Sequence, residues 1–395
     1  MSKTIMILGA GRGQVGLYKA ARAMGYRSLA VSIKGNYPGF ALADEIEYTD
    51  VTDKYAVLET AKKHNVDAVV TACVDITVPA LGYVCDNLGL SGITYEAAVV
   101  STNKLLMKTE FEKYGVRTAR FVKLRPGEDP DERCSGLDYP LIVKAVDLAG
   151  SRGINIVMKG DSLSEAVKRT MAETHVDYCI VEEYLEGGYE FSATAFVADG
   201  EILFILPMGD VRYGEHDEIP AGHYLPFEME DDQLEDFNLQ MTHGIRALGL
   251  DNCAVNCDLM LVNGKVYILE MTGRLGANCI PELTSIYIGY DINRMIIETA
   301  LGDRSFIPKI APEEIPRTPC YARMVVSDKS GTLKSITIDN ELDADILMFS
   351  SIGDQVRAFS CTNDCVGQLV TSGKTLEEAK EKADSANSRI YLGLE

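Results

Sequence analysis

Residues 254–271 read AVNCDLMLVNGKVYILEM, two apolar runs joined at Asn263-Gly264. An Asn-Gly pair between such runs is a strong signal for a β-hairpin. Each run carries one carboxylate, Asp258 in the first and Glu270 in the second. A two-residue turn would send these carboxylates to opposite faces of the sheet, because side chains alternate along a strand. We predict instead a three-residue loop that extends to Lys265 and places Asp258 directly opposite Glu270.

This pair of facing carboxylates predicts a metal site. Their Cβ atoms would lie about 5 Å apart, which is unfavourable unless a cation lies between them. Hard oxygen ligands of this kind suit Mg²⁺ that arrives with nucleotide phosphates, and Mn²⁺ could replace it. The alternative is a pair of solvated carboxylates on an edge hairpin. The apolar residues around Asp258 and Glu270 weigh against it.

A second feature is the apolar run Pro140–Ala145, with Lys144 near its end and the glycine-containing turn Ala149–Gly153 after it. A lysine in such a strand is costly to bury unless it meets an anion. Lys144 and the backbone N–H groups of the turn would together form a phosphate cradle. The alternative is a strand-end lysine that extends to solvent above an ordinary hairpin. The turn residues assigned to the cradle are Gly150, Ser151 and Gly153.

Two further segments carry polar groups near these features. Val181–Leu185 reads as a strand that enters the acidic turn Gly187–Glu190. Such a segment could present backbone edges to an adenine, with Glu190 accepting hydrogen bonds from ribose hydroxyls, although acidic turns after strands are also common without a ligand. Arg274 lies four residues after Glu270 in a glycine-containing loop, where it is well placed to neutralise a phosphoryl group or an oxyanion. A surface ion pair is the alternative for Arg274.

The composition of the 395-residue chain limits the class of protein. Lys and Arg number 38 and Asp and Glu 59, so the formal charge of −21 disfavours nucleic acid and anionic membranes as partners. No run approaches the roughly 18 apolar residues of a membrane-spanning helix, and Met1–Thr4 leads into a strand without the features of a signal peptide. The ten cysteines lack zinc-site spacing and read as small core residues. We therefore expect a cytoplasmic protein large enough for an enzyme.

The order of elements predicts three modules. Strand-like and helix-like segments alternate over residues 1–102, which is typical of a doubly wound, Rossmann-like α/β domain. Residues 103–307 mix strands, a hairpin and helices. Proline-rich 308–319 reads as a linker that opens a small α+β domain over residues 308–395. The last helix of that domain starts at the capping box Thr375–Glu378.

Gly11–Gly16 matches the dinucleotide fingerprint G-x-G-x-x-G between a strand and a helix. The acidic residue that NAD sites place after the second strand is missing, because Lys34-Gly35-Asn36 stands there. An NADP-linked reductase would need Lys34 to bind the 2′-phosphate. We favour the simpler interpretation, in which the glycines permit a tight turn between strand and helix.

Together and in order, these motifs resemble the ATP-grasp superfamily of carboxylate–amine ligases, and they are most similar to its L-amino-acid ligase, carbamoyl-phosphate synthetase and biotin carboxylase branch. The resemblance covers nearly the whole chain and implies a pre-ATP-grasp domain, a two-lobed ATP-grasp core and a C-terminal domain. It implies that Lys104 and Lys144 hold the phosphates of ATP and that Glu190 takes the ribose. It also implies that Arg274 steadies the reacting oxygens and that Arg323 faces the acid substrate. The adenine would be bracketed by Glu182, Glu183, Tyr184 and Leu185.

One position departs from the family pattern, which usually has an asparagine two residues after the second metal-binding glutamate. Thr272 stands there, and its hydroxyl is a shorter and weaker oxygen ligand than an amide. The metal ligands implied by the resemblance are therefore Asp258, Glu270 and Thr272, with the last contact weakened. Asn103 also replaces the aspartate that commonly precedes the first lysine.

The resemblance implies an ATP-dependent ligase acting on small molecules. ATP would phosphorylate a carboxylate, and an amine would displace phosphate from the acyl phosphate to form an amide, with amino acids as the expected substrates. A purine-pathway or carboxylase-like ligase on another small acid is an alternative, as is a non-catalytic nucleotide sensor of the same fold. His223, in the polar and loop-like segment Met208–Pro226, joins Arg274 and Arg323 as a candidate for substrate contact. A homodimer is expected by analogy alone.

Overall fold

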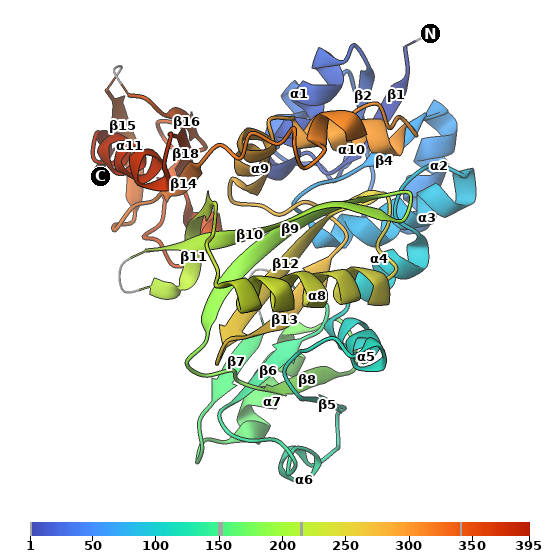
Figure 1. Ribbon diagram of the computed structural model, residues 1–395, viewed down its shortest axis with the longest axis vertical. Helices are drawn as coiled ribbons and strands as arrows, with labels where there is room; N and C mark the ends of the chain where they lie inside the picture. The colour runs from blue at the N-terminus through green and yellow to red at the C-terminus, as the bar shows by residue number, and fades with distance from the viewer. Residues whose placement is uncertain (1, 149–152, 214–215, 340–341) are drawn as a thin grey trace.

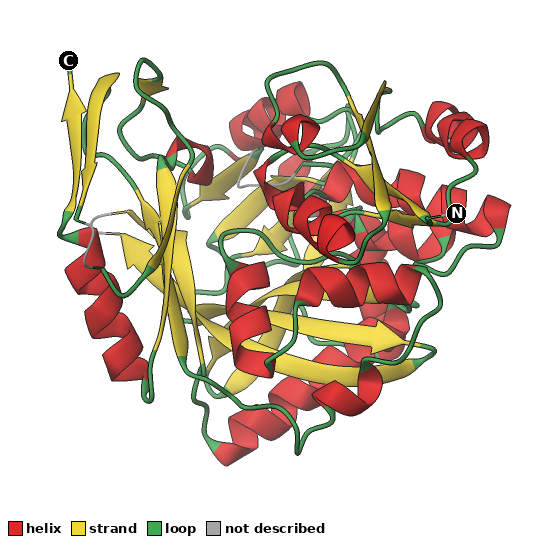
Figure 2. Ribbon diagram, turned by 90° about the horizontal axis from the view of Figure 1, so that it is seen from above, coloured by secondary structure: helices red, strands yellow, loops and turns green. Residues whose placement is uncertain are grey.

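Four β-sheets with helices packed around them make up the described part of the protein. The computed structural model describes residues 2–148, 153–213, 216–339 and 342–395. The strand orders are β3-β2-β1-β4, β5-β8-β6-β7, β13-β12-β9-β10-β11-β14-β18-β16 and β17-β15-β19. Figure 1 shows the N-terminal elements in blue at the top, the second sheet at the bottom and the C-terminal elements in red at the upper left. In Figure 2 the two chain ends lie on opposite sides of the molecule.

The first sheet is parallel throughout, as the alternating strand and helix pattern predicts. Its strand β1 is wholly buried because every residue is apolar or threonine. The edge strand β3 was not predicted, because its residues EIEY alternate between exposed and half-buried and carry little apolar signal. The strands are β1 (Thr4–Leu8), β2 (Arg27–Ser32), β3 (Glu45–Tyr48) and β4 (Ala68–Val70), and the helices are α1 (Val15–Ala23), α2 (Lys54–His64), α3 (Val78–Leu88) and α4 (Tyr95–Ser101).

The second sheet is antiparallel and carries helix α7 on one side. Helix α5 starts at Asn103, whose side chain accepts hydrogen bonds from the backbone N–H groups of Leu105 and Leu106. Asparagine therefore serves as the helix cap at this position. The strands are β5 (Phe121–Leu124), β6 (Leu141–Ala145), β7 (Ile154–Val157) and β8 (Cys179–Glu183), and the helices are α5 (Lys104–Tyr114), α6 (Pro130–Arg133) and α7 (Leu163–Glu173).

The eight-stranded sheet, called the long sheet below, forms the centre of the molecule. Side chains alternate between its faces, so Ala193, Ala195 and Val255 pack in the core with helix α8, while Ser192 and Asn256 lie on the other face. The strands are β9 (Tyr189–Ala198), β10 (Glu201–Tyr213), β11 (His216–Leu225), β12 (Cys253–Val262), β13 (Lys265–Thr272), β14 (Cys320–Val325), β16 (Asp345–Met348) and β18 (Gly367–Ser372). The helices beside it are α8 (Asp231–Ala247), α9 (Ile280–Ile288) and α10 (Ile292–Ala300).

The C-terminal residues add a small sheet and a helix. The predicted capping box opens helix α11, where Thr375 accepts a hydrogen bond from the backbone N–H of Glu378. The apolar side of this helix, with Ala379, Ala383 and Ala386, packs in a core cluster with residues of β14, β15 and β18. The elements are β15 (Gly331–Ile338), β17 (Gln355–Val356), β19 (Ile390–Leu394) and α11 (Leu376–Asn387). Short 3₁₀ turns occur at η1 (Arg12–Gln14), η2 (Pro38–Ala41), η3 (Asp75–Thr77), η4 (Ile307–Ile310) and η5 (Thr362–Asp364).

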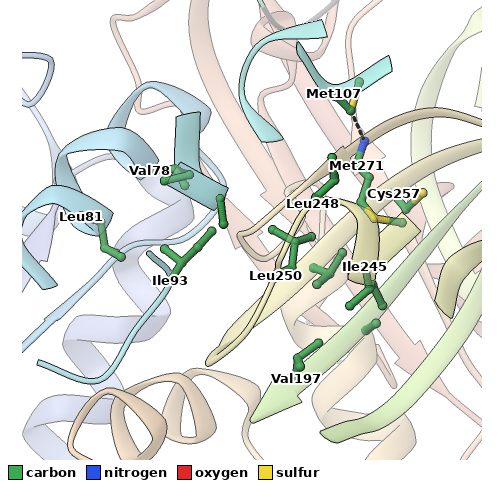
Figure 3. Packing of buried hydrophobic residues seen from close by; sticks show 14 of the residues in the cluster. Val78, Leu81, Ile93, Met107, Val197, Ile245, Leu248, Leu250, Cys257 and Met271 are labelled. Carbon is green, nitrogen blue, oxygen red and sulfur yellow. Dashed lines mark hydrogen bonds between the residues drawn. The ribbon is translucent and has the colours of Figure 1, made fainter. Parts of the chain in front are cut away.

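One apolar core runs from the first sheet into the long sheet. Figure 3 shows Val78 and Leu81 of α3 on one side and Ile245 and Met271 on the other, with Ile93 and other residues between them. This continuous packing fixes the N-terminal sheet against strands β12 and β13, which carry the carboxylate pair. None of the helices in the described residues is both long and apolar enough to span a membrane.

Candidate active site

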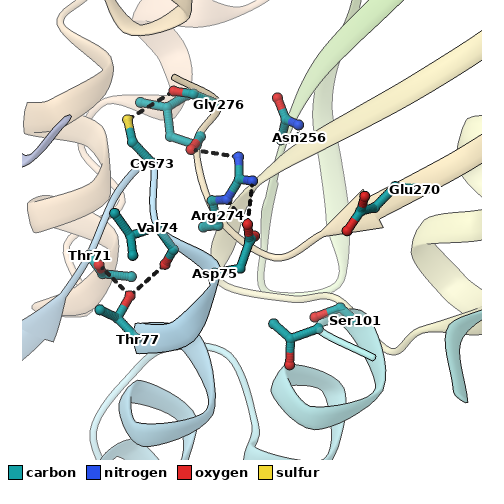
Figure 4. Close-up of polar contacts among 12 residues, drawn as sticks. Thr71, Cys73, Val74, Asp75, Thr77, Ser101, Asn256, Glu270, Arg274 and Gly276 are labelled. Atoms are coloured by element: carbon teal, nitrogen blue, oxygen red, sulfur yellow. Dashed lines mark hydrogen bonds and ion pairs between the residues drawn. The ribbon is translucent and has the colours of Figure 1, made fainter. Parts of the chain in front are cut away.

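The predicted carboxylates lie opposite each other on the face of the long sheet that points away from α8. In the β12–β13 ladder Asp258 pairs with Glu270, and Asn256 pairs with Thr272. In the next ladder Asp258 pairs with Ser192 of β9. Residues two apart on a strand share a face, so these polar side chains form one block. Figure 4 shows Asn256, Glu270 and Arg274 around this part of the site.

The pairing of the carboxylates is as predicted, but the loop that produces it is not. The turn has two residues, Asn263 with φ 50° and Gly264 with φ 72°, and it pairs Val262 with Lys265. These positive φ values are those of the tight hairpin turn that Asn-Gly favours. The register then shifts, because Leu259 pairs with Ile268 while Asp258 pairs with Glu270. Leu269 is the extra residue of a β-bulge, and this bulge turns Glu270 to the face of Asp258.

The electrostatics of Asp258 fit a cation site. Burial raises the pKa of Asp258 to about 7, and the neighbouring Glu270 and Glu190 carboxylates add to the rise. A buried acid surrounded by other acids gains most from a bound positive charge. Among the described residues no cluster of three or more His, Cys, Asp or Glu side chains fits a metal ion. Two carboxylates with phosphates and neutral oxygens match the way proteins usually hold Mg²⁺.

Lys104 faces this pair from helix α5. Its Nζ lies 3.0 Å from Glu270 Oε1 and donates to the carbonyl oxygen of Leu148 at 2.7 Å. Burial lowers the pKa of Lys104, but the carboxylates around it outweigh burial and the net shift is upward. Lys104 is therefore a charged, buried lysine beside the carboxylate pair, which is the position expected of a phosphate-binding group.

Lys144 belongs to a second group of charges, in which the Glu182 carboxylate lies between two lysines. Its Nζ lies 3.1 Å from Glu182 Oε2, and the Nζ of Lys108 lies 3.2 Å from the same oxygen. Lys108 and Glu182 are almost completely buried. The other oxygen, Glu182 Oε1, is buried and has no hydrogen-bond partner in the described residues. A buried acceptor without a partner fits a ligand that brings a donor, such as the amino group of adenine.

Lys108 is a site residue that was not predicted from the sequence. It lies one helical turn after Lys104, and both are buried on the same face of α5 as Met107 and Phe111. A second lysine at this spacing within an apolar stripe was the available signal. Its partner Glu182 lies far along the chain, so the ion pair itself could not be read from local spacing.

The rest of the predicted adenine segment leaves the sheet after β8. Glu183 points away from Lys108 and accepts a hydrogen bond from Arg120 Nε at 2.8 Å. The backbone N–H of Tyr184 donates to the carbonyl oxygen of Pro140 at 2.9 Å. Leu185 follows in a half-buried loop. Within this segment, the Glu182 side chain is thus the one that contacts Lys144 among the described contacts.

Glu190, the predicted ribose contact, lies at the start of β9 opposite Met260. Its Oε2 is 3.6 Å from Nη2 of Arg212 on β10. Burial raises the pKa of Glu190, and the Arg212 guanidinium partly offsets the rise. Glu190 also contributes to the raised pKa of Asp258, which places the two carboxylates in the same electrostatic field.

Arg274 joins the site to the N-terminal sheet. Its Nε lies 2.7 Å from Asp75 Oδ1 and its Nη2 lies 2.9 Å from Asp75 Oδ2, as Figure 4 shows. Burial opposes ionisation of Asp75, yet the Arg274 charge dominates and lowers the pKa of that carboxyl. The nearby carboxylate likewise raises the pKa of Arg274. Both groups are therefore charged, and the pair leaves Nη1 to donate to the carbonyl oxygen of Leu275 at 3.2 Å.

His223 lies in a second buried group farther along the sheet. Its Nδ1 is 2.9 Å from Asp210 Oδ1, which also accepts a hydrogen bond from Ser192 Oγ at 3.0 Å. Because Ser192 is the cross-strand neighbour of Asp258, this group continues the polar face of the sheet. The expectation that Met208–Pro226 is loop-like is wrong for most of its length. Its residues extend β10 and form β11, where polar side chains line a sheet face instead of a solvated loop.

The structure does not bring every candidate to this face. Arg323 on β14 pairs with Asp384 of α11, with Nη1 and Oδ1 2.8 Å apart. Its cross-strand partner is Gly222, so its side chain leaves the opposite face from that of His223. Gly153 closes the turn after β6, where its carbonyl oxygen accepts a hydrogen bond from the N–H of Ala145 at 2.9 Å. The predicted phosphate contacts Gly150 and Ser151 lie outside the described residues.

The Gly11–Gly16 loop is packed by the protein itself. The amide of Gln14 accepts a hydrogen bond from the N–H of Gly11 at 2.9 Å and donates to the carbonyl oxygen of Ala72. A Cβ at Gly16 would lie 2.6 Å from the side chain of Asn293 on α10. The glycines are thus explained by a tight turn under a helix, which is the interpretation favoured from sequence, and not by a bound dinucleotide.

The fold and the polar face together define a nucleotide-dependent ligase. Lys104 of helix α5 meets the paired carboxylates on the long sheet, Arg274 follows beside them, and Lys144 of the second sheet contacts Glu182. The sequence model described as the phosphoribosylglycinamide synthetase ATP-grasp (A) domain matches residues 102–301, and that of the L-amino acid ligase C-terminal domain 2 matches residues 323–395. The chain belongs to the ATP-grasp family, and the predicted resemblance, fold class and enzyme class are confirmed.

Similar proteins support membership of this family, two of them over nearly the whole chain. The chain is 38% identical to phosphoribosylglycinamide synthetase from Anaerococcus prevotii, with a TM-score of 0.85 and 100% of both chains covered. It is 25% identical over 405 residues to a formate-dependent phosphoribosylglycinamide formyltransferase from Synechococcus sp. (strain CC9902), covering 99% of this chain and 97% of that protein. It is 24% identical to alanine–anticapsin ligase from Bacillus subtilis over 67% of this chain and 60% of that protein. ATP and Mg²⁺ are typical of this family, as predicted.

Proposed function

We propose that this ATP-grasp enzyme joins a small carboxylate to an amine, with amino acids as the substrate class, through an acyl phosphate. The observation that carries the proposal is the position of Asp258 opposite Glu270, facing Lys104. Such a site can hold the terminal phosphates of ATP and a divalent cation beside a reacting carboxylate. Phosphoryl transfer then depends mainly on positioning and on neutralising charge.

The nucleotide half of the site is supported by the buried charges. Glu182 Oε1 is an acceptor without a partner in the described residues, and adenine offers an amino donor. Lys144, which contacts the other Glu182 oxygen, and Lys104 would contact the phosphates. Phosphate oxygens would compete with Glu270 for Lys104, freeing that carboxylate for the metal. Glu190 would accept from the ribose.

Mg²⁺ would be held by Asp258 and Glu270, and it would supply charge neutralisation at the phosphates. Arg274, fixed by Asp75, would donate to the phosphoryl or carboxylate oxygens as negative charge develops. His223, fixed by Asp210, would line the amine side of the pocket. Arg323 is ion-paired to Asp384 on the opposite face of the sheet and takes no part in the proposed reaction.

Two findings favour amino acids as substrates. The C-terminal residues match the domain model of L-amino acid ligases, and the chain also resembles an alanine–anticapsin ligase. A purine-type ligase is the second candidate, because two relatives named for phosphoribosylglycinamide cover nearly all of the chain. A homodimer also belongs to this proposal, and light scattering on the purified protein tests it.

A coupled assay for ADP and phosphate separates these candidates. The protein is incubated with ATP, Mg²⁺ and pools of amino acids, and in parallel with glycine plus phosphoribosylamine and with formate plus phosphoribosylglycinamide. We expect ADP release with an amino acid pool, and an amide product by mass spectrometry. Release only in a parallel reaction would select the purine-type candidate. Binding of ADP without turnover in any reaction would leave the nucleotide sensor as the function.

A further inference from the structure

We propose that Asn256 is a third protein ligand of the divalent cation, through its amide oxygen. This inference rests on the proposed metal pair Asp258 and Glu270. Asn256 Nδ2 lies 3.4 Å from Asp258 Oδ1, so its amide is in contact with one of the two carboxylates. Asn256 Oδ1 is buried and has no hydrogen-bond partner in the described part of the chain. An amide whose buried oxygen has no partner gains when that oxygen turns toward a bound cation.

The strand register places this amide in the right block of side chains. Asn256 lies opposite Thr272 in the same ladder that sets Asp258 opposite Glu270. The four side chains therefore share one face, with the amide one pair away from the carboxylates. Thr272 is almost fully buried and ends in a short hydroxyl on Cβ. Asn256 reaches farther from its strand than Thr272 and supplies a carbonyl oxygen.

A neutral oxygen ligand fits the set of donors around Asp258 and Glu270. No third acidic, histidine or cysteine side chain joins Asp258 and Glu270 to form a metal-binding cluster in the residues that the structure describes. A cation with two carboxylates takes its remaining ligands from phosphates, water and neutral oxygens. Half a turn about the last torsion of Asn256 exchanges its nitrogen and oxygen. With the amide turned this way, its oxygen lies beside Asp258 Oδ1, from which both can bind one cation, and its nitrogen lies against Gly276.

Gly276 makes room for this amide. A Cβ built at Gly276 would lie 2.3 Å from Asn256 Oδ1, a separation that real atoms do not reach. The loop after β13 therefore needs glycine here because the amide of Asn256 lies against it. This contact is independent of the hydrogen bond to Asp258 and shows that Gly276 encloses the end of the Asn256 side chain in either orientation of the amide.

Direct binding of Mn²⁺ to the full-length protein with ADP tests the inference, with electron paramagnetic resonance to count free Mn²⁺. Loss of a partner around a metal site already costs about 10- to 100-fold in metal affinity. We expect Asn256→Ala and Asn256→Leu each to weaken Mn²⁺ at least about tenfold, with the affinity for ADP alone unchanged. Asn256→Asp keeps a ligating oxygen and should bind Mn²⁺ at least as tightly as wild type.

A reciprocal exchange sharpens the test. Thr272→Asn in the Asn256→Ala background puts an amide on the facing strand and should restore most of the Mn²⁺ affinity. Thr194→Val is the packing control, because Thr194 is buried beside Asn256 in the neighbouring ladder and its removal should leave Mn²⁺ binding unchanged. Wild-type Mn²⁺ affinity in both Asn256→Ala and Asn256→Leu, or an equal loss in Thr194→Val, would overturn the proposal.

The readout separates this ligand from the rest of the proposed function. Glu270→Gln should abolish tight Mn²⁺ binding; if it does not, the carboxylate pair is not the metal site and Asn256 falls with it. Mn²⁺ binding needs neither the acid nor the amine. A protein that binds Mn²⁺ through Asn256 but forms no amide would therefore refute the ligase and leave this inference standing.

Discussion

Arg274 and Asp75 form a two-point ion pair, 2.7 Å from Nε to Oδ1 and 2.9 Å from Nη2 to Oδ2. The two residues are 199 positions apart, and the pair connects the end of the first sheet to the loop after the β12–β13 hairpin. A guanidinium held by two parallel bonds cannot rotate, so its direction is set by the N-terminal residues. These residues therefore take part in placing the arginine that the proposed reaction uses.

Asp75→Asn should lower kcat/KM by about 10²-fold, because misplacement of a reacting group by about 1 Å costs that much. Asparagine keeps one hydrogen bond to Arg274 but loses the charge and the second contact. The affinity for ADP should change little, because Asp75 lies outside the proposed adenine and phosphate contacts. Steady-state kinetics together with calorimetric titration of ADP measures both quantities.

Asp199→Asn is the matched control. Arg304 holds Asp199 by the same two-point geometry, at 2.8 and 2.7 Å, on an exposed part of the molecule. This variant should keep wild-type kinetics. Equal losses in the Asp75 and Asp199 variants would mean that the Arg274 pair has only a structural role.

Gly16→Ala should destabilise the protein by about 1–3 kcal/mol, although alanine normally favours a helix. The added methyl would lie 2.6 Å from Asn293, and α10 would have to move. Gly136→Ala, where the Cβ meets nothing within 4 Å, should keep or slightly raise the stability. Urea denaturation measures both, and wild-type stability in Gly16→Ala would contradict the packed loop.

NADPH fluorescence should not change on mixing with wild type, because the Gly11–Gly16 loop is filled by the protein itself.

Lys108→Met should show a stability difference from wild type that depends on pH. Burial lowers the pKa of Lys108 to about 8, despite the attraction of Glu182, whereas an unfolded lysine titrates near 10.4. Between these values the unfolded chain binds more protons than the folded chain, so the contribution of Lys108 to the free energy of unfolding rises with pH. Wild type should therefore gain stability relative to Lys108→Met from about pH 8 to 10.5.

Urea denaturation at about pH 7 and about pH 10 measures this difference. Burial raises the pKa of thiols such as Cys85 to about 12 in the folded chain, whereas an unfolded thiol ionises near 8.5. This contribution changes both proteins equally and cancels. Lys113→Met, at an exposed lysine on the same helix, should show no pH-dependent difference from wild type. A stability difference between wild type and Lys108→Met that does not change with pH would contradict the lowered pKa. Lys108 would then stay protonated over the whole range in its ion pair with Glu182.

His223→Gln should raise the KM of the amine about tenfold and leave ADP affinity unchanged. Glutamine can still donate to Asp210, so the fold is kept while the imidazole is lost. His64→Gln is the control, because His64 also contacts carboxylates but lies in the first domain beside Glu45 and Glu47. A fall in ADP affinity or in stability equal to the kinetic effect would assign His223 a purely structural role.

Local signals predicted the centre of the site. Asn263-Gly264 between apolar runs, and one carboxylate in each run, were enough to expect Asp258 opposite Glu270. The bulge at Leu269 was not predictable, because an extra residue in a strand leaves no mark on an apolar pattern that both registers satisfy. The right pair was thus predicted from the wrong loop.

Contacts between distant segments were beyond the sequence. Nothing near Lys108 indicates that Glu182 will meet it, and nothing near Asp75 indicates Arg274. The polar residues of β10 and β11 read as a loop because a strand that faces a buried polar site lacks the apolar alternation of an ordinary strand. The buried polar residues that indicate a site therefore also make its strands hard to predict from the sequence.

The long sheet continues beyond the proposed nucleotide site. Strand β14 adds directly to β11, with Gly222 through Leu225 paired to Arg323 through Cys320, and β18 and β16 continue from there. A chain cut before Cys320 would expose a row of unsatisfied main-chain groups, a template for aggregation. A chimaera that exchanges the C-terminal residues after β14 must therefore supply a strand that pairs with the free edge of β14, as β18 does in this chain.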